Sequence, residues 1–421
     1  MRFSPSNEAF YVYAARAARG FGDGFAVIIL PAYLSEIGFD AFRIGVIATA
    51  ALLGTAVTTL TAGFLGKQYD LRNLLLIMAF VMLATGVAIP SFEHLALLLP
   101  IFFVGTMNPQ AGDIGMMVPL EQSMLARRAT DEERTSIFSR YSLSGDLATA
   151  AGTLAAAMPD TLTSFGFSKI NALKAMFYLY AALGALSAVL YQALPAGQRE
   201  ETHGRAALGR SRGIVYKLTA LFSLDAFAGG FAVQSLVALW LFQRFGISLS
   251  AISTFYFCTT ILNAFSYLAA VRVAKRIGLV NTMVFTHIPS NLCLIIVAFI
   301  PSLSVVLAFL LIRAALSQMD VPTRTSYVMA VVTPAEQPAA AAITAAPRTL
   351  ALSVGPALSG VLLGTGFSGL PFVISGTLKT VYDLALLFGF RHIKPPEEQD
   401  KNLRSNNSGT PARQNGQQLI C

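Results

Sequence analysis

The chain has 421 residues, of which 55% are hydrophobic and only 12% are charged, whereas an ordinary soluble domain carries roughly a quarter charged residues. So few charges cannot cover a large wet surface, and most of the surface must therefore face lipid. The net charge of +8 is spread over short gaps between apolar runs, which argues against the continuous basic stripe of a nucleic-acid-binding protein. The composition predicts an integral membrane protein and no nucleic-acid partner.

Apolar stretches long enough to span a bilayer recur along almost the whole chain. A spanning helix needs about 20 mainly apolar residues. Twelve such stretches are expected near residues 12–37, 43–66, 73–91, 95–121, 136–158, 172–194, 215–242, 250–274, 280–300, 303–330, 336–363 and 368–391. The predicted fold class is therefore an all-α integral membrane protein with twelve transmembrane helices in two pseudo-symmetric six-helix bundles.

Basic residues near the span ends predict the orientation, because Lys and Arg are retained on the cytoplasmic side. The gaps after spans two, four, six and eight hold Lys67, Arg72, Arg127, Arg128, Arg134, Arg199, Arg205, Arg210, Arg212, Lys217, Lys275 and Arg276. The alternate gaps hold little beyond Arg43, Lys169, Lys174 and Arg244. Both termini are expected in the cytoplasm, in a multi-pass protein of a bacterial inner (plasma) membrane.

Two polar segments divide the chain into domains. The stretch PAGQREETHGRAALGRSRGIVYK is basic and too hydrophilic to cross a membrane. The tail after residue 392 is polar and has too little apolar surface to offset the entropy of ordering. We expect an N-terminal six-helix bundle over 1–194, a cytoplasmic linker over 195–214, a C-terminal six-helix bundle over 215–392 and a disordered cytoplasmic tail over 393–421.

The two halves repeat each other at a spacing of a little over two hundred residues. The string GFAV occurs at 24–27 and again at 230–233, VPLEQS from Val118 aligns with VPTRTS from Val321, and TDEER from Thr130 aligns with TPAEQ from Thr333. The last match puts Glu three residues after Thr in both halves, a capping box that starts a helix. Two six-helix units related by an axis along the membrane normal are typical of secondary transporters.

The chain resembles the major facilitator superfamily over residues 10 to 392. The stretch LPAYLSEIGFDAFRIG from Leu30 is similar to the end of the family's first helix and its outer loop, and GFLGKQYDLRN from Gly63 is similar to the motif G-x-L-a-D-r-x-G-r after the second helix. Lys67 stands at the Asp position of that motif and Asp70 at its second Gly. In the family this Asp helps to hold the cytoplasmic side closed, so the resemblance implies a differently arranged charge network here.

Charged residues inside the predicted spans are the candidate solute and proton site, because intramembrane charge is expensive and usually functional. In span 1, Arg16, Arg19 and Asp23 share a helix face, and in span 10 Arg313, Ser317, Asp320 and Arg324 form a polar stripe. Span 4 is expected to carry a parallel stripe of Gln110, Asp113, Met117 and Glu121. The predicted cavity residues are Arg19, Asp23, Asp113, Asp146, Asp225, Arg313, Asp320 and Arg348.

The repeat also pairs residues of opposite charge, Glu121 with Arg324 and Arg19 with Asp225. We expect Glu121 and Arg324 to form an ion pair across the halves when the cytoplasmic gate shuts. The predicted gate residues are Glu121, Arg324, Lys67, Asp70 and Lys275.

Each of these charges also has a structural interpretation. Arg16 with Asp23, and Lys379 with Asp383, stand at spacings that let partners on one helix satisfy each other. Arg348 lies one step from the repeat equivalent of Asp146 and faces either that residue or the cavity. His287 titrates near neutrality in principle, but a lone His is more often a packed polar residue.

The expected function is secondary active transport of a small solute by alternating access. No phosphate-binding loop of the Walker type, His-rich cluster or nucleophile–base arrangement occurs in the sequence, so we predict no enzyme activity, metal or cofactor. Protons are the expected coupling ion, through Asp23 or Asp320. Efflux of drug-like or metabolite compounds is the first expectation, proton-coupled uptake or export of an organic anion the second, and a transporter-like sensor or scaffold the third. The expected partners are the solute, protons and membrane lipid, with the chain acting as a monomer.

Overall fold

The computed structural model describes residues 5–110, 115–126, 131–197, 209, 211–333 and 336–392, and these residues form helices joined by short connections. The first half contains α1 (Pro5–Glu36), α2 (Ala41–Gln68), α3 (Leu71–Ala88), the short 3-10 helix η1 (Ile89–Ser91), α4 (Leu95–Val104), α5 (Met117–Ala126), α6 (Asp131–Ala155), α7 (Met158–Ser164) and α8 (Lys169–Gln192). The second half contains α9 (Arg212–Gly230), α10 (Gln234–Phe245), α11 (Leu249–Ile277), α12 (Leu279–Val297), α13 (Leu303–Ser317), α14 (Asp320–Ala330), α15 (Gln337–Leu363) and α16 (Leu370–Phe390).

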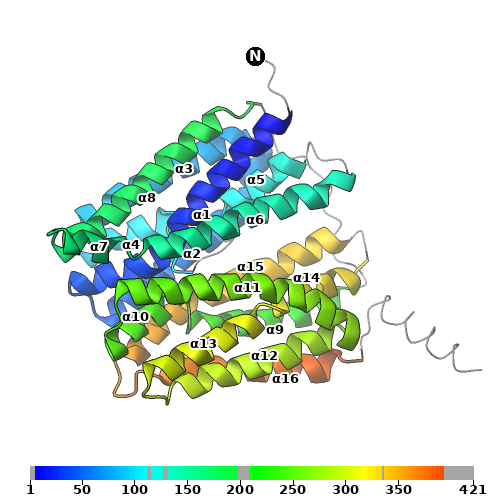
Figure 1. Ribbon diagram of the computed structural model, residues 1–421. Helices are drawn as coiled ribbons and strands as arrows, with labels where there is room; N and C mark the ends of the chain where they lie inside the picture. The colour runs from blue at the N-terminus through cyan, green and yellow to red at the C-terminus, as the bar shows by residue number, and fades with distance from the viewer. Residues whose placement is uncertain are drawn as a thin grey trace, which may run out of the picture.

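Helices α1 to α8 pack into one bundle and α9 to α16 into a second (Figure 1). Within the described residues, nine helical segments are long and apolar enough to cross a membrane, and some of them join two consecutive helices. The remaining three expected spans differ for visible reasons: α1 carries Arg16, Arg19 and Asp23, α6 carries Arg140 and Asp146, and α4 has only 10 residues. Charged residues lower the hydropathy of α1 and α6, and a helix break shortens α4. Length and hydropathy alone therefore do not mark these three as spans.

The expected continuous helix over 95–121 is wrong. Helix α4 ends at Val104, Gly105 has extended backbone angles, and α5 begins at Met117. Pro109 lies between them and disfavours helical geometry in the residue before it, and its carbonyl accepts a hydrogen bond from the amide of Ser235 in the other half (3.0 Å). Gln110 thus lies in a non-helical segment, and the expected helical stripe from Gln110 to Glu121 does not form.

Spans 7 and 10 are interrupted in a similar way. The chain turns between α9 and α10 at residues 231–233 and between α13 and α14 at residues 318–319. Broken helices within a bundle expose backbone groups only where protein or water can satisfy them. Ala232 and Gln318, which lie at the two interruptions, line an interior cavity of the second bundle.

The repeated glycines make equivalent close contacts in the two bundles. A Cβ atom on Gly24 of α1 would lie 2.2 Å from the carbonyl oxygen of Thr149 in α6, and one on Gly152 would lie 2.0 Å from that of Phe21. In the second bundle, a Cβ atom on Gly230 of α9 would lie 2.5 Å from the carbonyl oxygen of Leu352 in α15. Small residues allow helix backbones to approach this closely, which explains why the GFAV string occurs in both halves.

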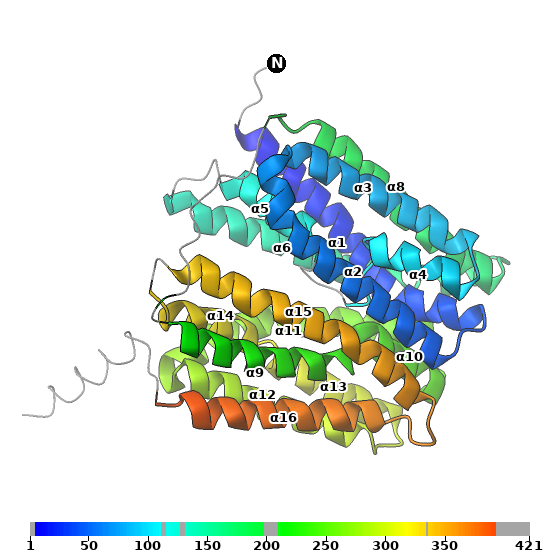
Figure 2. The same cartoon turned by 180° about the vertical axis from the view of Figure 1, so that it is seen from behind.

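The two bundles meet at the ends of the helices that lie away from the basic connections. Helices α2 and α15 run side by side there and separate toward their other ends (Figure 2). A Cβ atom on Gly45 would lie 2.4 Å from the carbonyl oxygen of Pro356, and the Thr49 hydroxyl accepts a hydrogen bond from the amide of Ala357 (2.9 Å). On the opposite side of the interface, the Asp160 carboxylate accepts bonds from both the amide and the hydroxyl of Ser250.

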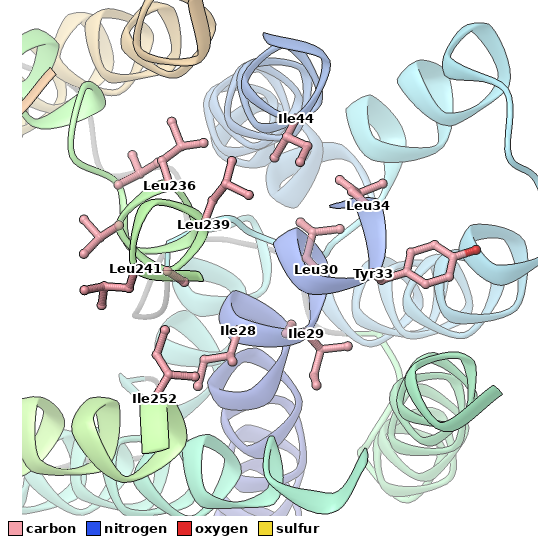
Figure 3. Packing of buried hydrophobic residues seen from close by; sticks show 14 of the residues in the cluster. Ile28, Ile29, Leu30, Tyr33, Leu34, Ile44, Leu236, Leu239, Leu241 and Ile252 are labelled. Atoms are coloured by element: carbon pink, nitrogen blue, oxygen red, sulfur yellow. The ribbon is translucent and has the colours of Figure 1, made fainter. Parts of the chain in front are cut away.

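An apolar cluster seals the centre of this contact. Side chains from α1 pack against those of α10 and α11, with Ile28 beside Ile252 and with Leu30 and Leu239 in the same cluster (Figure 3). All four side chains are buried. The bundles are thus joined at one end and diverge toward the end that carries the basic connections, which is the end expected from the sequence to face the cytoplasm.

Candidate functional site

A cavity of about 260 Å³ lies in the interior of the second bundle and reaches the first bundle at Gln110. Helices α9, α11, α12, α13, α14, α15 and α16 all contribute to its wall. Four of the predicted cavity residues line it, namely Asp225, Arg313, Asp320 and Arg348. Arg324, Lys379 and His287 line it as well, so the cavity wall carries a dense set of ionisable groups.

Two carboxylates of this wall are bound by two cations. Lys379 donates to Asp225 at 2.6 Å, and Arg324 lies 3.2 Å from the other oxygen of Asp225 and 3.1 Å from Asp320. Buried charges persist only where partners offset the cost of removing them from water. Asp225, Asp320, Arg324 and Lys379 therefore form a network that is neutral as a whole.

Arg313 and Arg348 are the remaining guanidinium groups of the wall. The Nε atom of each is buried and has no hydrogen-bond partner within the described part of the chain. Neither residue takes part in any of the ion pairs that the described side chains form. These two side chains therefore present positive charge to the cavity that the protein itself does not neutralise.

The first bundle contains a separate buried network around Glu121. This side chain is 0% exposed, binds the Arg19 guanidinium and accepts hydrogen bonds from the hydroxyls of Tyr141 and Tyr191 at 2.6 Å each. Arg19 and the half-buried Asp23 also line a small cavity of about 40 Å³. Neither residue lines the central cavity, so their predicted place in the solute and proton site stays a prediction.

The charge inversion between the halves has a simple structural explanation. Arg19 and Glu121 pair within the first bundle, and their repeat equivalents Asp225 and Arg324 pair within the second. Exchanging both charges preserves the ion pair. The expected pair between Glu121 and Arg324 is absent from this conformation, because each already has partners in its own bundle; that gate pair therefore stays a prediction for a closed state.

The expected local pair of Lys379 with Asp383 is wrong. Lys379 binds Asp225, whereas both carboxylate oxygens of Asp383 lie close to His287 Nδ1 (2.9 and 3.1 Å) and one accepts from the side chain of Asn291 (2.8 Å). The helix spacing permits the local pair, but packing of α16 between α9 and α12 offers each side chain a partner on a different helix. Sequence reasoning missed Asn291, Tyr141 and Tyr191, which carry no pattern beyond being polar residues in apolar spans.

The other predicted site residues lie apart from these networks. Asp146 is half-buried on α6 and belongs to neither set of cavity-lining residues. Asp70 caps α3 by accepting from the amide of Arg72 (3.0 Å) and also accepts from the amide of Gly197. Lys275 is exposed in the last turn of α11. Asp113 and the side chain of Lys67 lie outside the described residues. The cavity role of Asp113 and Asp146 and the gate role of Lys67, Asp70 and Lys275 therefore stay predictions.

A contact between the start of α15 and the segment before α9, centred on Glu336, replaces the expected capping box. Helix α15 begins at Gln337, with Glu336 as its N-cap residue. The Glu336 carboxylate accepts hydrogen bonds from the hydroxyls of Ser211 (2.7 Å) and Thr333 (2.8 Å) and from the amide of Gly209. It thereby ties the segment before α9 to the start of α15. The repeat counterpart, Thr130 with the side chain of Glu133, lies outside the described residues.

These bonds predict a pH dependence of stability. The hydrogen bond from Ser211, followed by those from Thr333 and Gly209, lowers the pKa of Glu336 to about 2. Because the pKa is lower in the folded state, this stabilisation is present at neutral pH and is lost as the pH falls from the ordinary Glu value toward 2. Glu336→Gln should lower the melting temperature at pH 7 and flatten its decline in acid, measured on purified protein in detergent. The control is Glu93→Gln, which removes an exposed carboxylate 3.6 Å from Lys174. The same dependence of melting temperature on pH in wild type and Glu336→Gln would contradict the stabilising role of Glu336.

Two bundles of membrane-spanning helices around an interior polar cavity define the architecture of a secondary transporter. The model of the Major Facilitator Superfamily matches residues 12–317 and 218–415. The chain therefore belongs to the major facilitator superfamily, a family of transporters and not of enzymes.

Relatives of known sequence or structure agree with this fold. The Saccharomyces cerevisiae protein described as "Uncharacterized membrane protein YJR124C" is 22% identical over 395 residues, which cover 85% of this chain and 88% of the yeast protein. The crystal structure of the nucleoside transporter NupG matches with a TM-score of 0.72 at 13% identity, covering 92% of this chain and 100% of NupG. The inward open structure of the xylose transporter XylE from E. coli matches with a TM-score of 0.69 at 14% identity, covering 94% and 99%. At these identities the two structures establish the fold alone.

Proposed function

We propose that this transporter moves a small organic anion by alternating access. The observation that supports the proposal is the charge of the central cavity, which is lined by four cationic side chains and two carboxylates. The carboxylates are already bound by Arg324 and Lys379. Arg313 and Arg348 are left to bind an anionic group, and a planar guanidinium suits a carboxylate or phosphate through two parallel hydrogen bonds.

The rest of the wall suits the remainder of such a solute. Phe255 and Tyr256 offer aromatic surface, and Gln110, Gln234 and Asn263 offer amide groups. A volume of about 260 Å³ fits a solute of modest size. The proposed substrate class is therefore a small organic anion that carries a carboxylate or phosphate on a partly apolar body.

This charge balance changes the order of the expected functions. Proton-driven efflux of a cationic compound suits a site where the solute and the proton compete for the same carboxylate. Here the accessible carboxylates are held by cations, and the surplus charge is positive. An anion that binds together with a proton fits the cavity better, so we favour anion transport over efflux of drug-like cations.

The setting of the protein in its membrane is part of the proposal. Both termini are cytoplasmic, because the basic connections lie at those helix ends. The cavity lies within one chain, so a monomer suffices for transport. The bacterial inner membrane expected from the sequence stays a proposal. A yeast protein matches 85% of this chain, so a eukaryotic membrane is the alternative location. Fluorescent tagging in the native host distinguishes the two.

Ligand-induced stabilisation of the purified protein tests the solute class. Benzoate, benzenesulfonate and succinate are compared with benzylamine and putrescine, which are cations of similar size. A ligand at 100 times its dissociation constant stabilises a protein by about 2.7 kcal/mol. We expect at least one anion and neither cation to raise the melting temperature; stabilisation by the cations alone would overturn the assignment.

A further inference from the structure

A buried His–Asp pair lies directly behind the wall of the central cavity. His287 of α12 lines the cavity and is 5% exposed, whereas Asp383 of α16 is 0% exposed and lies on the far side of the imidazole. The distances from His287 Nδ1 to the two carboxylate oxygens are 2.9 and 3.1 Å, and Asn291, one turn along α12, donates to the carboxylate at 2.8 Å. The pair thus connects the cavity to the interior of the second bundle.

With a neutral imidazole, the His287–Asp383 pair carries one negative charge that no described lysine or arginine contacts directly. Ionisable groups on the neighbouring helices line the same cavity as His287 or contact its ring. They come from α9, α11, α13, α14, α15 and α16: Asp225, Tyr256, Arg313, Asp320, Arg324, Arg348, Lys379 and Tyr382. Asp225 and Asp320 are bound by Lys379 and Arg324. The contacts described for Asp383 include no lysine or arginine, only His287 and Asn291. With a neutral imidazole, the pair therefore carries a charge of −1.

We propose that the His287–Asp383 pair is the site that binds and releases the transported proton. A proton from cavity water adds to Nε2 of His287 while Nδ1–H remains bonded to Asp383, and the pair changes from a charge of −1 to neutral. Burial favours the neutral pair over an isolated carboxylate. Release of the proton from Nε2 to water restores the neutral imidazole and the charge of −1, so no other reactant is needed.

The position of the pair couples the proton to an anionic solute. Protonation adds positive charge to a wall that already carries Arg313 and Arg348, and this strengthens anion binding. By thermodynamic reciprocity, a bound anion strengthens proton binding to the same degree. This coupling rests on the proposed anion function, whereas the proton site itself does not.

The carboxylates expected from the sequence to carry the proton are less suited to it. Asp320 and Asp225 each have a cationic partner within 3.2 Å, so protonation would leave a buried cation without its counter-ion. Asp23 lines the separate small cavity of the first bundle with Arg19 beside it. Asp383, in contrast, has the imidazole of His287 as its partner.

Two measurements test the proton site. The first uses purified protein without solute, labelled with ¹³C-histidine, and follows its NMR spectrum from about pH 8 to pH 5, the range in which an imidazole ordinarily changes charge. We expect a signal that responds to acidification, that is missing in His287→Gln and that no longer responds in Asp383→Asn. His94→Gln, at an exposed histidine before α4, should remove a different signal. A His287 signal that ignores pH would overturn the proposal.

The second measurement uses reconstituted vesicles with radiolabelled benzenesulfonate or succinate as the probe. His287→Gln and Asp383→Asn should lower accumulation driven by a proton gradient at least tenfold, a larger loss than in exchange of probe against probe, which should stay above that of protein-free vesicles. Proton-driven accumulation that persists in both variants would overturn the site. If wild type moves neither probe, the anion function fails, and the spectroscopic titration still decides the proton site.

Discussion

Replacing Arg313 and Arg348 by glutamine is expected to weaken anion binding by about 10- to 100-fold for each residue. A hydrogen bond to a charged group contributes about 1.5–3 kcal/mol, and about 1.4 kcal/mol corresponds to a factor of ten in affinity. Both side chains line the cavity, and the Nε atom of each is buried without a partner in the described structure. The dissociation constant of the best-stabilising anion, measured by thermal shift or calorimetry, gives the effect directly.

These variants should also leave the fold intact, because neither arginine holds a carboxylate of the protein. Arg276→Gln, at an exposed residue at the end of α11, removes the same charge far from the cavity and is the matched control. Unchanged anion affinity in the double variant Arg313→Gln with Arg348→Gln would show that the anion binds elsewhere.

Glu121→Gln is expected to destabilise the protein by about 3–5 kcal/mol, because it leaves the buried Arg19 guanidinium without its counter-ion. The side chain of Glu121 is 0% exposed and binds Arg19, Tyr141 and Tyr191. Replacing both members of the pair with methionine removes both charges, so Arg19→Met with Glu121→Met should recover most of the loss. The melting temperature in detergent measures both effects.

Charge exchange separates pairing within a bundle from pairing across the gate. Arg19→Glu with Glu121→Arg keeps one charge of each sign in the first bundle and should retain a folded protein. Glu121→Arg with Arg324→Glu instead puts like charges beside Arg19 and beside Asp225 and should lower expression and transport. The opposite ranking would show that the partner of Glu121 in function is Arg324.

The transmembrane class, the duplication and the family were predictable from the sequence, because each depends on long patterns. Apolar runs of spanning length recur whatever the tertiary packing, and the GFAV strings were found without knowledge of their contacts. The structure adds the reason for that repeat, since Gly24 and Gly230 each lie against the backbone of a neighbouring helix.

The pairing of charges could not be predicted in the same way. Sequence spacing indicates which residues share a helix face, but Glu121, Arg324, Lys379 and Asp383 all find their partners on other helices. The angle and distance at which two helices pack decide whether a side chain binds a partner on its own helix or on another one. A single sequence does not specify these two quantities. The break between α4 and α5 was missed for a related reason: the segment is apolar enough to span, and only Pro109 and Gly105 indicate that the helix stops.

Flux of an anion and a cation of matched size into vesicles that contain the purified protein tests the account most directly. Benzenesulfonate or succinate inside the vesicles should exchange with labelled anion outside, and the exchange should fall at least tenfold in Arg313→Gln with Arg348→Gln. Benzylamine and putrescine should not exchange above protein-free vesicles. Exchange of the cations with no exchange of the anions would contradict a basic central cavity as the transport site.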